Sequence, residues 1–170
     1  PVLAIPAGRP RAAPRLMLVT GDAVVGPGEV EPDDKDWTWV LERPCPECGF
    51  DATAVAPVAV AGAIRDNAAV WREVLGHDDV RERPAPGVWS PLEYACHVRD
   101  VCTLFDVRLA LMLDQDDPVF ANWDQDQTAL LERYWESDPA AVAVEIGAAG
   151  PRAADAFDAV ADAEWARPGM

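Results

Sequence analysis

Two sets of side chains in this sequence could carry chemistry, and they lie well apart along the chain. The first is His97, whose imidazole can bind a divalent metal ion or exchange a proton near neutral pH. The second is the pair Cys45 and Cys48, whose thiolates could share one zinc ion or act as a redox pair. The 170-residue sequence has two histidines and four cysteines in all, so few residues can complete either site.

The residues around His97 predict a helix with a well-marked start. Ser90 is a suitable N-cap, Pro91 fits the first helical position, and Glu93 stands where a capping box requires it. We expect this helix to run from Pro91 to about residue 113. Helical spacing then places His97 at the margin of one apolar face, formed by Tyr94, Val98, Val101, Phe105, Leu109 and Met112. A histidine there either hydrogen-bonds a carbonyl or carboxylate or binds a metal, and the spacing leaves both interpretations open.

Four further residues are candidates for a site around His97. His77 follows Gly76 in a turn, where a solvated side chain is the ordinary expectation, but that turn lies near the start of the His97 helix and could bring a second ligand. Glu93 and Asp100 flank the His97 face and could orient the imidazole, although charged residues on a helix flank are usually just solvated. Trp123, in the loop after the helix, could line a pocket.

The segment from Cys45 to Gly49 reads Cys-Pro-Glu-Cys-Gly and predicts a tight turn. Two thiolates on such a turn supply half of the four ligands of a structural zinc site. Cys102 is expected to pack as a small hydrophobic residue instead of joining them. The turn also precedes the first long helix, whereas His97 is expected near the far end of that helix. The sequence therefore leaves open a labile dithiol, a separate zinc knuckle or an inert turn.

The segment Trp89-Ser-Pro-Leu-Glu-Tyr-Ala-Cys-His97 resembles the second-helix signature of the DinB and YfiT-like superfamily, and the lead-in from Trp37 to Asp51 looks like that of an actinobacterial branch. The resemblance implies an all-α, DinB-like up-down bundle of the four-helix type. It also implies a divalent metal, zinc or nickel, with His97 as one ligand. Members of the superfamily include bacillithiol transferases and mycothiol-dependent maleylpyruvate isomerase, so a low-molecular-weight thiol is a further implied cofactor.

The predicted organisation has three parts: an irregular arm over residues 1–36, a Cys-x-x-Cys lead-in over 37–55, and the bundle over 56–170. Besides the His97 helix, apolar periodicity and caps predict helices over residues 56–75, 128–135 and 139–165, the last kinked or broken at Gly150-Pro151. The resembling family carries two more histidines, as His-x-x-x-His, on a last helix that this chain lacks. We expect that helix to lie beyond Met170, and its absence to leave a groove that a second copy fills in a homodimer.

Composition excludes some classes of partner. The formal charge is −16, with 14 basic residues scattered among 30 acidic ones, which disfavours nucleic acid. No apolar run reaches the roughly 18 residues of a membrane helix, and no signal peptide is evident, so we expect a cytoplasmic protein without a membrane partner. The first functional hypothesis is a metal-dependent transferase, isomerase or hydrolase acting on a small molecule. The alternative is a non-catalytic bundle that binds or interacts, with a redox- or zinc-responsive Cys45/Cys48 pair.

Overall fold

The computed structural model describes residue 30 and residues 37–169, and this part of the chain is helical without strands. Three long helices are α1 (Pro57–Val74), α2 (Pro91–Asp114) and α4 (Pro139–Asp158), and α3 (Gln125–Leu131) is short. Single turns of 3-10 helix complete the list: η1 (Trp37–Leu41), η2 (Ala52–Ala54), η3 (Tyr134–Glu136) and η4 (Asp162–Glu164). None of the described helices combines the length and apolar character needed to cross a membrane. The predicted arm over residues 1–36 lies outside the described residues, Val30 excepted.

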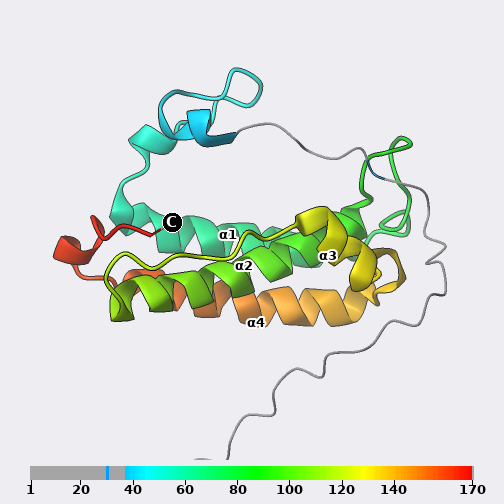
Figure 1. The fold of residues 1–170 in the computed structure, drawn as a ribbon. Coiled ribbons are helices and arrows are strands. Elements are labelled where there is room, and N and C mark those ends of the chain that lie inside the picture. The colour runs from blue at the N-terminus through cyan, green and yellow to red at the C-terminus, as the bar shows by residue number, and fades with distance from the viewer. Residues whose placement is uncertain (1–29, 31–36, 170) are drawn as a thin grey trace, which may run out of the picture.

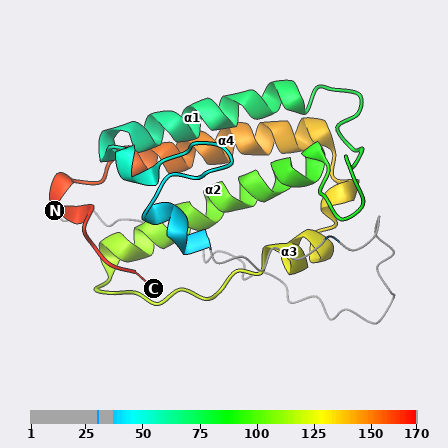
Figure 2. The same ribbon diagram turned by 90° about the horizontal axis from the view of Figure 1, so that it is seen from above.

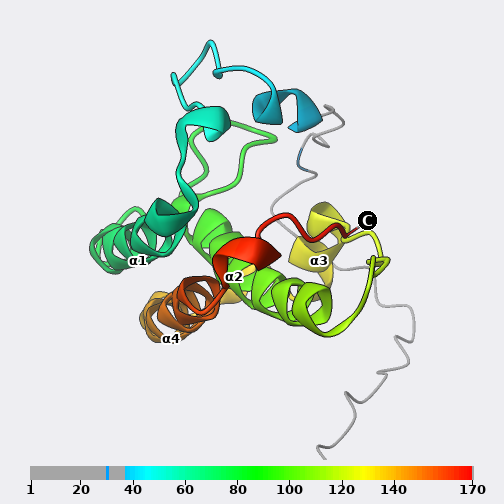
Figure 3. The same cartoon turned by 90° about the vertical axis from the view of Figure 1, so that its left-hand side faces the viewer.

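The three long helices form a bundle in which α4 packs against both α1 and α2 (Figures 1 and 3). Helix α2 runs antiparallel to α1, and residues 75–90 connect the two helices (Figure 2). The connection over residues 115–138, which contains α3, then crosses back along the bundle, so α4 runs parallel to α2 (Figure 2). No long helix follows α4 in the described residues. Instead, the Arg167 side chain donates hydrogen bonds to the carbonyl oxygens of Met112 and Gln115 at the end of α2.

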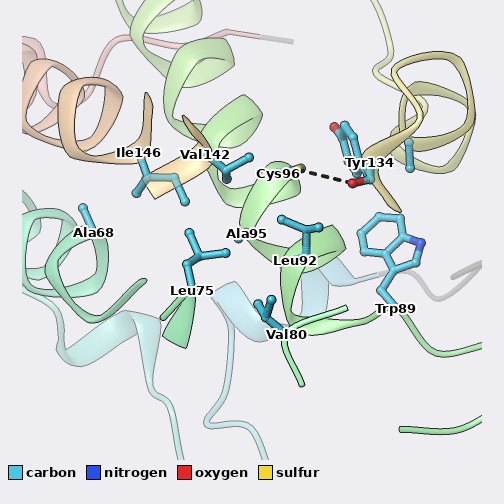
Figure 4. Packing of buried hydrophobic residues seen from close by; sticks show 11 residues of the cluster. Ala68, Leu75, Val80, Trp89, Leu92, Ala95, Cys96, Tyr134, Val142 and Ile146 are labelled. Carbon is cyan, nitrogen blue, oxygen red and sulfur yellow. Dashed lines mark hydrogen bonds between the residues drawn. The ribbon is translucent and has the colours of Figure 1, made fainter. Parts of the chain in front are cut away.

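The core differs between the two helix contacts: small residues pack where α1 meets α4, and larger side chains pack where α2 meets α4. Helices α1 and α4 approach so closely at Gly150 that a Cβ built there would lie 2.5 Å from the Cβ of Ala68. Between α2 and α4 the buried cluster is built from bulkier groups, and it extends to Trp89 and to Tyr134 after α3 (Figure 4). Its members are Ala68, Leu75, Val80, Trp89, Leu92, Ala95, Cys96, Ala129, Tyr134, Val142 and Ile146.

The predicted start of α2 is confirmed, but the face that it buries differs from the prediction. Ser90 and Glu93 form the capping box, and Pro91 is the first residue of the helix. The buried face carries Leu92, Ala95 and Cys96, because α4 packs on that side. On the face predicted to be buried, Leu109 is buried but two aromatic side chains are exposed, namely Tyr94 and Phe105.

Two other helix boundaries also correct the prediction. Helix α4 continues through Pro151, because the carbonyl that proline leaves unbonded belongs to Gly147, which is exposed and can be hydrated. It ends at Asp158, not near residue 165. Helix α3 begins earlier than expected, at the N-cap Asp124, and stops before Arg133, whose backbone is left-handed with φ 51°.

Candidate functional site

The His97 side chain is held between two tryptophans. Its ring stacks on Trp123, with centroids 5.3 Å apart and planes 6° from parallel, and it meets Trp89 at 5.3 Å and 51°. Trp89 comes just before α2, whereas Trp123 lies in the crossing connection. The Nδ1 atom of His97 is buried and has no hydrogen-bond partner among the described residues. The sequence left open that His97 is a core histidine hydrogen-bonded to a carbonyl or a carboxylate, but its Nδ1 makes no such bond to the described residues.

The start of α3 fixes the position of Trp123. Its indole Nε1 donates to Thr128 Oγ1 at 2.9 Å, and that hydroxyl donates to the Asp124 carbonyl oxygen at 2.7 Å. The Asp124 carboxylate in turn caps α3 by accepting from the Gln127 backbone N–H at 2.8 Å. The stacking surface for His97 is thus anchored to a capped helix, although it lies in a loop.

Burial lowers the pKa of His97 below the ordinary histidine value. The charges of Asp100 and Asp126 act in the opposite direction, but the loss of hydration outweighs them. A lowered pKa keeps the imidazole neutral at pH 7, and only neutral imidazole has the free lone pair that metal binding or proton abstraction requires.

His97 borders two cavities. The larger, about 660 Å³, lies between α1 and α2 and is lined mainly by apolar side chains of both helices, with Asn67, His97 and Cys102 as its polar groups. Residues of the lead-in also line it: Phe50, Ala52 and Val55. The smaller cavity, about 250 Å³, is more polar and includes Trp89, Tyr94, Gln125 and Asp126 beside His97. The larger cavity, which is mostly apolar with a few polar groups, is of the kind that typically binds small molecules.

Glu93 is occupied in holding the start of α2. Its carboxylate is buried and accepts four hydrogen bonds. Arg83 donates from Nε at 3.0 Å and from Nη2 at 2.5 Å, and Ser90 donates from its backbone N and from Oγ, both at 2.8 Å. Burial alone would raise the pKa of Glu93, but the hydrogen bonds from Arg83 and Ser90 lower it overall. None of these contacts involves His97, so Glu93 supports the helix that carries the imidazole.

Asp100 is likewise hydrogen-bonded to residues other than His97. It accepts hydrogen bonds from Arg99 Nε at 2.7 Å and from the hydroxyl of buried Tyr134, while Arg99 also pairs with Glu145 at 2.9 Å. This network joins α2 to the turn after α3 and to α4. The Asp100 charge still acts on His97 through space, without a hydrogen bond to its Nδ1.

The remaining metal candidates do not gather around His97. His77 is exposed in the turn after α1 and lines neither cavity that His97 borders. Within residues 30 and 37–169, no three His, Cys, Asp or Glu side chains lie close enough together to hold a metal ion. The described part of the chain thus places one unpartnered ring nitrogen, His97 Nδ1, at this site without a cluster of three possible metal ligands.

Cys45 and Cys48 are free thiols on an exposed turn of the lead-in. Backbone N–H groups of Cys48 and Glu47, and the Cys48 thiol, donate to the Cys45 sulfur and lower the pKa of Cys45. Burial instead raises the pKa of Cys102, as expected for a thiol packed like a hydrophobic residue.

Sequence reasoning missed several residues of the His97 site. Asp126 and Gln125 belong to the first turn of α3 and reach the smaller cavity only because the crossing connection folds back along α2. Asn67 enters the larger cavity from α1. The only signal for Gln125 and Asp126 was the loop after α2, in which Trp123 was expected to line a pocket; nothing in the sequence indicated Asn67.

Comparison with known proteins gives one result. The family model of the DinB superfamily matches residues 61–170, which is well over half of the chain and includes α2 with His97. No curated protein and no solved structure matches the sequence. The helical bundle agrees with this match. The chain belongs to the DinB superfamily.

Proposed function

We propose that this chain is a metal-dependent DinB-like enzyme that acts on a small molecule bound between α1 and α2, with His97 as one ligand of a divalent ion, zinc or nickel. The observation that carries the proposal is the buried, unpartnered Nδ1 of His97 at the edge of the cavity. A buried polar atom without a partner is costly, and a bound ion is one way to satisfy it. The reaction class that the family implies is a thiol-dependent transfer, an isomerisation or a hydrolysis.

The chain's own residues would bind the substrate and position the imidazole. The apolar walls of the larger cavity favour a substrate with substantial apolar surface, and Asn67 offers it a hydrogen bond. Trp89 and Trp123 restrict the rotation of the His97 ring, so the lone pair keeps one direction. A divalent ion, when bound, would supply Lewis acidity that favours the ionised form of a thiol or a water molecule.

One imidazole gives weak metal binding, so we expect this 170-residue chain to bind zinc or nickel weakly. The test is metal titration in a background that carries Cys45→Ser and Cys48→Ser, so that thiolates do not compete. We expect His97→Ala to weaken binding at least about tenfold, in line with the loss of a metal ligand. The matched control His77→Ala removes the other histidine and should leave binding unchanged. Equal binding by the His97→Ala variant and the control would refute the proposal.

The alternative function is a non-catalytic bundle that binds a partner and whose Cys45/Cys48 pair responds to redox state or zinc. It is favoured by the lack of a three-ligand group in the described residues. The enzyme proposal requires metal contact at His97, whereas the alternative permits an empty site there. The same titration therefore separates the two functions.

A further inference from the structure

The turn at Cys45 is closed by two backbone hydrogen bonds. Cys45 N donates to the Phe50 carbonyl oxygen at 2.7 Å, and Gly49 N donates to the Cys45 carbonyl oxygen at 2.8 Å. Gly49 has φ +74°, a left-handed conformation that glycine adopts without strain. The closed turn carries both free thiols, Cys45 and Cys48, on the same short segment.

The two thiols are not equivalent. Hydrogen bonding from the backbone of Cys48 and Glu47 lowers the pKa of Cys45, which favours its thiolate. Cys48 is the more exposed member of the pair. This asymmetry fits an attacking thiolate at Cys45 and a second thiol that resolves the product.

A closed zinc site does not account for the pair. A structural zinc ion takes four ligands, and no third His, Cys, Asp or Glu joins the pair in the described residues. The other two cysteines lie on α2, where Cys96 is buried and Cys102 lines the cavity. Residues 1–36 contain neither cysteine nor histidine, so they supply no further thiolate or imidazole ligand.

We propose that Cys45 and Cys48 form a thiol–disulfide exchange site for low-molecular-weight disulfides. The Cys45 thiolate attacks one sulfur of a disulfide RS–SR, the RS–SR bond breaks, and RS⁻ leaves and takes up a proton. Cys48, having lost its proton to solvent, then attacks the Cys45 sulfur of the mixed disulfide. A second RS⁻ leaves and is protonated, so the protein dithiol is oxidised by two electrons and RS–SR is reduced to two RSH. This site is independent of the metal proposal for His97.

The turn is linked to the α1–α2 cavity. Phe50, whose carbonyl oxygen accepts from Cys45 N, also lines the cavity that His97 borders. A small disulfide reduced at the turn would therefore release its thiols next to a wall of the candidate substrate site.

The test uses the full chain, freed of metal with EDTA, and oxidised glutathione as the probe. After acid trapping and alkylation, peptide mass spectrometry should find a reversible Cys45–Cys48 disulfide in the unsubstituted chain. Cys48→Ser should stop at a stable mixed disulfide on Cys45. Cys45→Ser should react at Cys48 at least about tenfold more slowly, because the amide-stabilised thiolate is gone. Cys96, which is fully buried, serves as an internal reference in every sample and should stay unmodified longest.

Three results would overturn the proposal. The first is the absence of the disulfide at any ratio of oxidised to reduced glutathione. The second is modification of Cys48 in Cys45→Ser as fast as Cys45 reacts in the Cys48→Ser chain. The third is zinc that resists EDTA and protects both thiols, which would assign the pair to a zinc site completed by another chain. Circular dichroism of each variant checks that the bundle is still folded.

Discussion

Glu93→Gln tests whether the buried carboxylate at the start of α2 serves stability, as its contacts indicate. The substitution keeps the size of the side chain and removes its charge. In the native chain, four hydrogen bonds converge on this carboxylate, two from Arg83 and two from Ser90. Glutamine can accept at one oxygen only, and its amide nitrogen would face donors from Arg83 or Ser90.

The expected loss of unfolding free energy is about 2–4 kcal/mol. Removing one member of a buried ion pair costs about 3–5 kcal/mol, and glutamine recovers part of this by keeping one acceptor. The matched control is Glu145→Gln, which removes the same charge from a pair with Arg99 whose glutamate side chain is 51% exposed. An exposed pair contributes about 1 kcal/mol or less.

The stability that Glu93 contributes should also depend on pH. Its pKa is lowered in the folded protein, so its contribution is fully present above the pKa of an unfolded glutamate, about 4.3, and declines as pH falls through the lower folded pKa. Urea denaturation should give the same difference in unfolding free energy between the native chain and Glu93→Gln at pH 7 and pH 5. At pH 3.5 that difference should be smaller. A difference in unfolding free energy below about 1 kcal/mol at pH 7, or one that grows in acid, would show that the Glu93 carboxylate does not stabilise the start of α2.

Three further predictions follow from the packing. Gly150→Ala should lower the unfolding free energy by about 1–3 kcal/mol in urea denaturation, because the new methyl group meets Ala68 across the α1–α4 contact. The control Gly147→Ala places a methyl group where no atom lies within 4 Å, so it should raise the unfolding free energy by about 0.5–1 kcal/mol. Trp123→Ala should raise the pKa of His97 toward the ordinary value, since it removes the ring that buries the imidazole, and NMR titration that finds a lower pKa would contradict this. Light scattering should find a homodimer, because α1 and α2 expose apolar side chains outside the cavity, namely Val58, Val70 and Val107. A monomer that binds no hydrophobic dye would show that the described segments already complete the core.

Local signals predicted the helix that carries His97, but not the surroundings of the ring. Ser90, Pro91 and Glu93 specify the start of α2 within a few residues, so its boundary was readable. Which face of α2 is buried depends on where α4 packs, and periodicity alone does not contain that information. Leu92 and Ala95 were therefore missed as core residues.

Contacts made through the crossing connection were the least predictable part of the site. Trp123 stacks on His97 because residues 115–138 return along the bundle, which joins residues far apart in sequence. The stop of α3 before Arg133 depends on one left-handed residue without a glycine signal. Glu93 illustrates the opposite case, because its capping role was legible in the sequence whereas its pairing with Arg83 was not.

The most direct test of the central claim is the position of a bound metal ion. Crystals of the full chain, grown with zinc or nickel and measured at the absorption edge of that metal, would locate the ion by its anomalous signal. If His97 is a metal ligand, a peak will lie about 2.1 Å from one of its ring nitrogens, beside the α1–α2 cavity. Metal only at Cys45 and Cys48, or no peak at His97 at saturating metal, would contradict it.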